Sequence, residues 1–125
     1  MPVELNHTIV HARNNAESAS FYADILGLSP PTKLWHFMVV PLANGVSLDF
    51  METSDDIQPQ HYAFLVTEPE FDAIFLRIQQ RGLTYYPGPS HANPGQINHL
   101  FGGRGVYFED PAGNFLEVLT RPYSL

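Results

Sequence analysis

Hydrophobic and polar residues follow the same succession of patterns twice along the chain. In the first half, a strand-like run over residues 5–11 is followed by Asn14, a residue suited to cap a helix, with Glu17 placed to complete a capping box. Gly27 is a typical C-terminal glycine and should end that helix. These signals predict a strand followed by a helix.

The rest of the first half predicts paired strands. Asn44-Gly45 is the strongest short hairpin signal in the chain. The strand-like runs on either side of it cover residues 34–40 and 46–51. The first half is therefore expected to form a strand, a helix and further strands.

The second half repeats this order after the polar segment 54–59. Thr67 and Glu70 form a second capping box, and apolar residues spaced at i, i+3, i+4 and i+7 predict an amphipathic helix that ends at Gly82. The expected strands of this half cover residues 60–66, 83–86, 105–109 and 114–120. The chain is therefore predicted to duplicate a βαβββ unit.

This duplication predicts an α+β fold in one domain of 1–125. Module one covers about residues 1–54 and module two about 58–125. We expect the two tandem βαβββ modules to form a curved, barrel-like mixed sheet around a central cavity.

Composition narrows the class of protein. The 125 residues are 44% hydrophobic and 15% charged, which is typical of one globular domain with a real core. The absence of cysteine excludes disulfides and thiolate metal sites, and a net charge of -7 argues against nucleic acid as a partner. With no signal peptide and no apolar run long enough to span a membrane, the sequence predicts a cytoplasmic protein that does not bind membranes.

Glu117 is the most unusual residue in these patterns, because it lies inside the apolar run 115–119. A strand that is apolar on both faces is expected to be covered on both faces. A carboxylate buried there needs a cation, a metal ion or a proton, since an unpaired buried charge costs several kcal/mol or more.

The duplication suggests partners for Glu117. His7 and His61 lie in the first strands of the two halves, whereas Asp49 and Glu117 lie in their last strands. If the halves pack about a pseudo-twofold, these side chains converge, and two imidazoles with one carboxylate form a set that leaves positions open on Fe(II), Mn(II) or a similar ion. A single strand histidine is more often structural, and Asp49 could simply face water, so the joint placement carries this interpretation.

The helix ending Ser18-Ala-Ser-Phe-Tyr-Ala-Asp-Ile-Leu-Gly-Leu28 and the turn-strand Asp110-Pro-Ala-Gly-Asn-Phe-Leu-Glu117 resemble the vicinal oxygen chelate superfamily, over essentially the whole chain. This superfamily includes glyoxalase I, bleomycin-resistance proteins, fosfomycin-resistance transferases and extradiol dioxygenases. The resemblance implies a metal site of His7, His61 and Glu117, with Asp49 at the position of a fourth ligand. It also implies a homodimer.

Within that superfamily, residues 97–117 are similar to the extradiol ring-cleavage signature. The resemblance gives His99 and Tyr107 catalytic roles beside the metal. There they would donate hydrogen bonds to the bound catecholate or dioxygen and transfer protons. One departure is that no further histidine precedes His61 in the region 46–60, where larger ring-cleaving enzymes carry one.

A substrate pocket is expected to be apolar with a few polar anchors. The candidate lining is aromatic, with one arginine as an anchor for an anionic substrate, although such aromatic residues are as often part of the core. The candidates are Trp35, Phe37, Phe50, Phe101, Phe115 and Arg104.

Three functions follow from these observations. The first is a metal-dependent dioxygenase of extradiol character acting on a small oxygen-chelating molecule, with Fe(II) as the first choice of metal and Mn, Ni or Zn as alternatives. The second is a glyoxalase-like lyase or isomerase, which Asp49 as a fourth ligand would favour. The third is a metal-free small-molecule-binding protein of the bleomycin-resistance type.

Overall fold

The computed structural model describes residues 2–124, which divide into two compact units, residues 2–58 and 59–124. Each unit contains one long helix and one four-stranded mixed sheet, so the predicted α+β class is confirmed. Neither sheet closes on itself into a barrel. Within the described residues, no helix is both long and apolar enough to cross a membrane.

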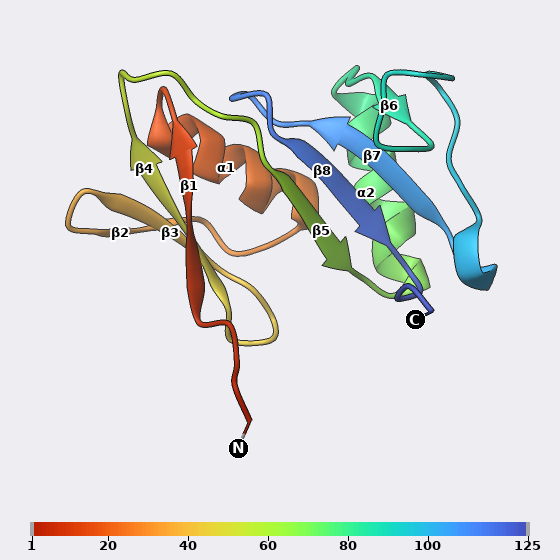
Figure 1. Cartoon of the computed structure of the whole chain (residues 1–125), viewed down its shortest axis with the longest axis horizontal. Coiled ribbons are helices and arrows are strands. Elements are labelled where there is room, and N and C mark those ends of the chain that lie inside the picture. Colours follow the sequence, from red (N-terminus) through yellow and green to blue (C-terminus); the bar gives the residue numbers. More distant parts are fainter. Residues whose placement is uncertain (1, 125) are drawn as a thin grey trace. The chain divides into compact units, whose positions relative to one another are not determined.

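The first unit is built around a sheet with the strand order β1-β4-β3-β2. β1 runs parallel to β4, whereas the pairs β3–β4 and β2–β3 are antiparallel. Helix α1 packs against the sheet (Figure 1). The elements are β1 (His7–Ala12), α1 (Asn15–Leu26), β2 (Thr32–Leu34), β3 (Phe37–Pro41) and β4 (Ser47–Glu52).

Helix α1 has the two ends that the sequence predicts. The Asn14 side chain accepts a hydrogen bond from the Glu17 amide at 3.0 Å, and Gly27 closes the helix in a left-handed conformation with φ 71°. The face between these caps is buried, and its Tyr22 ring meets the Phe50 ring of β4 edge to face at 4.8 Å. Capping and burial therefore fix the helix on the sheet.

The prediction of one strand over residues 34–40 is wrong. The chain turns at Trp35 and His36, so that Leu34 pairs with Phe37 in a second hairpin. Trp35 has φ 54°, a conformation that few bulky residues adopt. No sequence signal predicted this turn, because neither Gly nor Asn occurs in it. The predicted hairpin at Asn44-Gly45 is confirmed, with β3 and β4 on either side of it.

The second unit repeats the topology, with the strand order β5-β8-β7-β6 and a parallel β5–β8 pair. β8 and β7 are the two interior strands, so their central residues are buried. The elements are β5 (His61–Leu65), α2 (Glu68–Gln80), β6 (Tyr85–Tyr86), the short 3₁₀ helix η1 (Leu100–Gly102), β7 (Gly105–Glu109) and β8 (Phe115–Leu119).

Helix α2 begins with the predicted capping box. The Thr67 hydroxyl accepts from the Glu70 amide, and the Glu70 carboxylate accepts from the Thr67 amide. Phe71, Ile74 and Ile78 form the buried face of this helix. The predicted end at Gly82 is close to the observed one, since the helix stops at Gln80.

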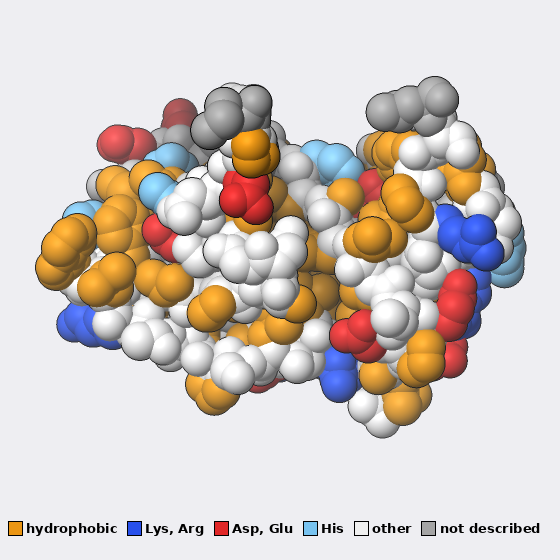
Figure 2. Space-filling model, turned by 90° about the horizontal axis from the view of Figure 1, so that it is seen from below, with side chains coloured by type: hydrophobic (Ala, Val, Ile, Leu, Met, Phe, Trp, Pro, Cys, Tyr) orange, Lys and Arg blue, Asp and Glu red, His pale blue; other side chains and the backbone are white. Residues whose placement is uncertain are grey.

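Basic side chains are few on the surface. Figure 2 shows Lys and Arg side chains on one face of the molecule as separate small spots and not as a continuous basic surface. The chain has only six Lys and Arg residues against 13 Asp and Glu residues.

The capping box gives a first testable prediction. Thr67→Ala removes the hydroxyl that satisfies a free amide of the first helical turn, so it should lower the free energy of unfolding by about 1 kcal/mol. Urea denaturation followed by circular dichroism measures this loss. Thr84→Ala, at an exposed position outside the helices and strands, is the control and should change stability by less than about 0.5 kcal/mol; equal effects of the two substitutions would contradict the capping role.

Candidate metal centre

The two units place a histidine and a carboxylate in the same register. In the second unit, His61 pairs with Phe115 and Ala63 with Glu117 along the parallel strands β5 and β8. In the first unit, Ile9 of β1 pairs with Asp49 of β4, and His7 lies two residues before Ile9. Because side chains two residues apart share a face of a strand, each histidine lies on the same face as the residue opposite the carboxylate.

Glu117 is buried as the sequence predicts, with 1% of its surface exposed. It lies at the centre of β8, between β5 and β7. Its carboxylate oxygen Oε1 is 3.1 Å from His61 Nε2, and both of its oxygens accept from the Tyr123 hydroxyl. A histidine and a phenol therefore hold this carboxylate, and Arg104, one of the two arginines near it in sequence, pairs with Glu68 and Asp72.

The second nitrogen of His61 determines what the first can do. Nδ1 lies 2.8 Å from the backbone carbonyl oxygen of Phe115, and a carbonyl can only accept, so Nδ1 carries a proton. In the neutral ring, Nε2 is then an unprotonated nitrogen that faces a carboxylate oxygen. Such a pair is favourable when a proton lies on either group or when a metal ion binds both atoms. Fixing Nδ1–H on a backbone carbonyl is also how metal-binding histidines are oriented.

Two phenols extend this group. Tyr107, buried on β7, lies opposite Glu117 in the strand register and stacks on His61 with ring centroids 5.8 Å apart. Its hydroxyl is 3.3 Å from the hydroxyl of Tyr123, which is 2.8 and 2.7 Å from the two Glu117 oxygens. The four residues form one hydrogen-bonded and stacked cluster, which we call the Glu117 cluster: His61, Tyr107, Glu117 and Tyr123.

Both phenols hold their protons more tightly than free tyrosine. Burial, the hydrogen bond to Tyr123 and the charge of Glu117 raise the pKa of Tyr107 far above its usual value of 10.0. For Tyr123, the hydrogen bond to Tyr107 lowers the pKa, but the hydrogen bond to Glu117, burial and the Glu117 charge outweigh it, and the net pKa is raised. At neutral pH both groups are therefore proton donors.

The first unit holds the related pair more loosely. His7 Nδ1 lies 2.7 Å from the Asn6 side-chain oxygen, which leaves Nε2 of this exposed ring as the outward nitrogen. Asp49 Oδ1 accepts from the Ser47 hydroxyl at 2.8 Å and is only partly buried. Within the residues the structure describes, no three His, Asp or Glu side chains gather closely enough to form a metal site. The donors of the second unit nevertheless fit a divalent ion, because a buried carboxylate and an oriented Nε2 converge there.

The other predicted catalytic residue, His99, is not hydrogen-bonded to the Glu117 cluster. His99 is exposed at the start of η1 and forms no hydrogen bond or ion pair with any residue between 2 and 124. Its catalytic role stays a prediction.

The predicted pocket residues fall in different environments. Phe50 is fully buried and belongs to the core of the first unit. The ring centroid of Phe115 lies 5.6 Å from that of Tyr107. Arg104 pairs with Glu68 at 2.9 Å and Asp72 at 2.8 Å, and both hydrogen bonds raise its pKa. This arginine fastens β7 to the start of α2, and its role as a substrate anchor stays a prediction.

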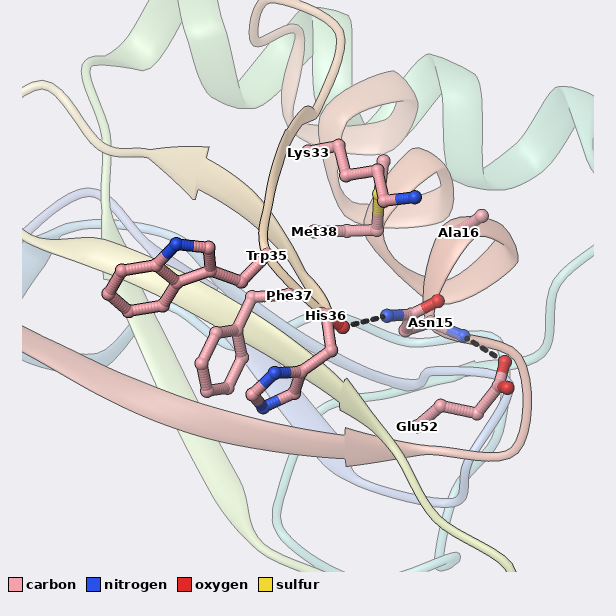
Figure 3. Close-up of a pocket in the computed structure, with 8 residues that line it drawn as sticks. All are labelled: Asn15, Ala16, Lys33, Trp35, His36, Phe37, Met38 and Glu52. Carbon is pink, nitrogen blue, oxygen red and sulfur yellow. Dashed lines mark hydrogen bonds between the residues drawn. The ribbon is translucent and has the colours of Figure 1, made fainter.

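Trp35 and Phe37 line an open pocket of about 560 Å³ in the first unit, with the neighbouring His36 and Met38 (Figure 3). Asn15 Nδ2 donates to the His36 carbonyl at 3.0 Å and ties the turn to the start of α1. The indole of Trp35 is 79% exposed. The turn therefore presents aromatic surface that a flat ligand could cover.

Sequence reasoning missed Tyr123. It lies six residues after Glu117 and beyond β8, where no strand or helix pattern relates the two positions. The available signal was a tyrosine in a short segment that follows a strand with a buried carboxylate.

The chain is similar to known proteins in sequence and in fold. A sequence model described as the Glyoxalase/Bleomycin resistance protein/Dioxygenase superfamily matches residues 4–118. The solved structure of Oxidase ChaP-H1 is 58% identical with a TM-score of 0.97, covering 99% of this chain and 100% of that one. Oxidase ChaP-H2 is 56% identical with a TM-score of 0.96, covering 99% and 98%. Glutathione transferase FosA of Serratia marcescens is 28% identical over 91% of this chain and 78% of its own.

The raised pKa of Tyr107 predicts a loss of stability in alkali. Above pH 10 the unfolded chain releases this proton while the folded chain keeps it, so the free energy of unfolding should fall as pH rises through that range. Tyr107→Phe removes this contribution, so its stability should fall less between pH 9 and about pH 11 in urea denaturation. Tyr85→Phe, which alters a phenol that packs on Phe75, is the control; a steeper fall in Tyr107→Phe than in the wild type would contradict the assignment.

Proposed function

The chain belongs to the glyoxalase/bleomycin resistance protein/dioxygenase superfamily, and from this membership we propose that it is a divalent-metal-dependent enzyme of the oxidase type. Its substrate would be a small molecule that presents two adjacent oxygen atoms. Fe(II) is the proposed metal, and ring cleavage of extradiol character is the first reaction to test. His61 and Glu117 are the proposed ligands of the second unit, and His7 is the proposed further ligand.

One observation carries this proposal. Nε2 of His61 lies 3.1 Å from a carboxylate oxygen of the buried Glu117, while Nδ1–H is fixed on a backbone carbonyl. A structural role for Glu117 would more simply use an arginine, yet Arg104 pairs with Glu68 and Asp72. A metal ion stabilises an arrangement in which two ligand atoms, here His61 Nε2 and a Glu117 oxygen, face each other with no permanent positive charge beside them.

The oxidase character is supported by the relatives. Two proteins that share more than half of their residues with this chain over nearly the whole length are named oxidases. The stretch from Ile97 to Glu117, which resembles the extradiol signature, contributes Tyr107 to the Glu117 cluster.

The residues of the chain would divide the work between binding and proton transfer. A bound Fe(II) would supply the electrophilic and redox chemistry that oxidation by dioxygen requires. His61 and Glu117 would hold the ion, and the Phe115 carbonyl would keep the imidazole in the right tautomer. Tyr107, whose raised pKa keeps its proton at neutral pH, would donate a hydrogen bond to an oxygen that becomes negatively charged. His99 is the proposed second proton carrier.

A lyase or isomerase reaction is the second candidate, and one observation favours it. Asp49 has the register in the first unit that Glu117 has in the second, since both lie opposite the residue two positions after the strand histidine. A fourth protein ligand would leave fewer open positions on the metal and suits polarisation of a carbonyl more than binding of dioxygen. The homodimer and the cytoplasmic location stay predictions.

Metal content tests the proposed centre. Protein purified anaerobically without a histidine tag should contain near-stoichiometric metal by mass spectrometry, and His61→Ala, Glu117→Ala and His7→Ala should each lose most of it. Iron or manganese supports the oxidase, while nickel or zinc favours the lyase or isomerase.

The matched control is the second histidine–glutamate pair of the same unit. His91 and Glu109 form an ion pair on the exposed surface, so His91→Ala should keep the wild-type metal content. Wild-type protein that takes up no metal after reconstitution with each ion would rule out both enzyme candidates and leave the metal-free binding protein.

Oxygen consumption tests the reaction. With Fe(II) restored, the wild type should consume dioxygen in the presence of a catechol-type substrate. Tyr107→Phe removes the proton donor next to Glu117 and should lower kcat by about 10²-fold or more, with similar metal content. His99→Ala should also lower kcat if its side chain carries protons, and a wild-type kcat in both variants would contradict the assigned roles.

A further inference from the structure

The C-terminal segment, residues 120–124, returns to the buried carboxylate. Tyr123 lies in no strand or helix, and its side chain remains 49% exposed. Its hydroxyl is nevertheless 2.8 Å from Glu117 Oε1 and 2.7 Å from Oε2. One exposed tyrosine therefore reaches a glutamate that is only 1% exposed.

Two aromatic residues hold Tyr123 in this position. The Phe101 ring of η1 lies 5.6 Å from the Tyr123 ring, and the Tyr107 hydroxyl is 3.3 Å from the Tyr123 hydroxyl. Phe101 has φ 55°, in the left-handed region that bulky residues rarely adopt, and its side chain is 46% exposed. Such strain at an exposed aromatic residue is often retained for a specific contact.

The Tyr123 hydroxyl contacts the two carboxylate oxygens of Glu117, the atoms through which a metal ion would bind. A carboxylate offers about four lone-pair positions. The Tyr123 hydroxyl lies within hydrogen-bond distance of both oxygens, and His61 Nε2 lies 3.1 Å from Oε1. A cation that binds through either oxygen beside His61 would compete with the phenol.

We propose that Tyr123 is a displaceable plug of the metal centre: the C-terminal segment caps Glu117 in the metal-free protein and leaves the carboxylate when a divalent ion binds. The proposal rests on the proposed role of Glu117 as a metal ligand. Displacement needs no rearrangement of the sheet, because residues 121–124 lie outside every strand and helix. The phenol gives the buried carboxylate a donor until the metal replaces it.

A contact present only in the metal-free state lowers the apparent affinity for the metal, because binding must first break it. A hydrogen bond to a charged group is strong enough for its loss to change an equilibrium about ten-fold or more. Tyr123→Phe keeps the ring on Phe101 and removes the hydroxyl. It should therefore bind Mn²⁺ about ten-fold more tightly than the wild type.

The experiment is a titration of chelator-stripped full-length protein with Mn²⁺, followed by electron paramagnetic resonance of the free ion. Tyr85→Phe is the matched control, since it removes a phenol of the same unit whose ring packs on Phe75, and its dissociation constant should equal that of the wild type. Phe101→Ala removes the ring that packs against Tyr123, and it should tighten Mn²⁺ binding by a smaller factor than Tyr123→Phe.

Thermal unfolding supplies a second readout that does not depend on activity. Tyr123→Phe should lower the unfolding midpoint of the metal-free protein and leave that of the Mn²⁺-loaded protein unchanged, because the hydrogen bond exists only without metal. Unchanged or weaker Mn²⁺ binding by Tyr123→Phe, with normal binding by the wild type, overturns the plug alone. If neither protein binds Mn²⁺, Fe(II), Ni²⁺ or Zn²⁺, the proposed metal centre falls together with it.

Discussion

The burial of one negative charge organises the second unit. Glu117 lies in the middle of an interior strand with apolar neighbours on either side, where an isolated carboxylate would be strongly unfavourable. The chain meets this constraint with a histidine from the adjacent strand and a phenol from the C-terminal segment, and not with a permanent cation. In the proposed metal centre a metal ion would replace these groups, whereas a carboxylate paired with an arginine could not exchange its partner at comparable energy.

The internal repeat explains how such a centre can arise from distant segments. Both units have the same strand order and the same histidine–carboxylate register, although Asp49 is more exposed than the corresponding Glu117. The difference lies in the surroundings. Asp49 is satisfied by a nearby serine, whereas Glu117 draws two aromatic hydroxyl-bearing residues around it. The two units thus share a topology, and within residues 2–124 the second unit alone builds a polar cluster around a buried carboxylate.

Local signals predicted the elements that local interactions control. The capping residues Asn14 and Thr67, the hairpin at Asn44-Gly45 and the buried position of Glu117 are all present as expected. Prediction failed where a long-range contact overrides local preference. The turn at Trp35 has no Gly or Asn, and it is held from outside by Asn15, which bonds the His36 carbonyl. For the candidate pocket residues, only the structure shows the surroundings: carboxylates of helix α2 pair with Arg104, and Phe50 is buried in the core of the first unit.

The sequence by itself determined the duplicated βαβββ order, the family and the presence of a carboxylate that needs a partner. These properties depend on periodicity, caps and motifs that are encoded within a few residues. Only the tertiary structure decided which nitrogen of His61 faces Glu117 and that Tyr123 returns to this carboxylate. The reason is physical: hydrogen-bond distances between residues on different strands depend on how the strands pair and where the segment after β8 folds back, and no local pattern records either.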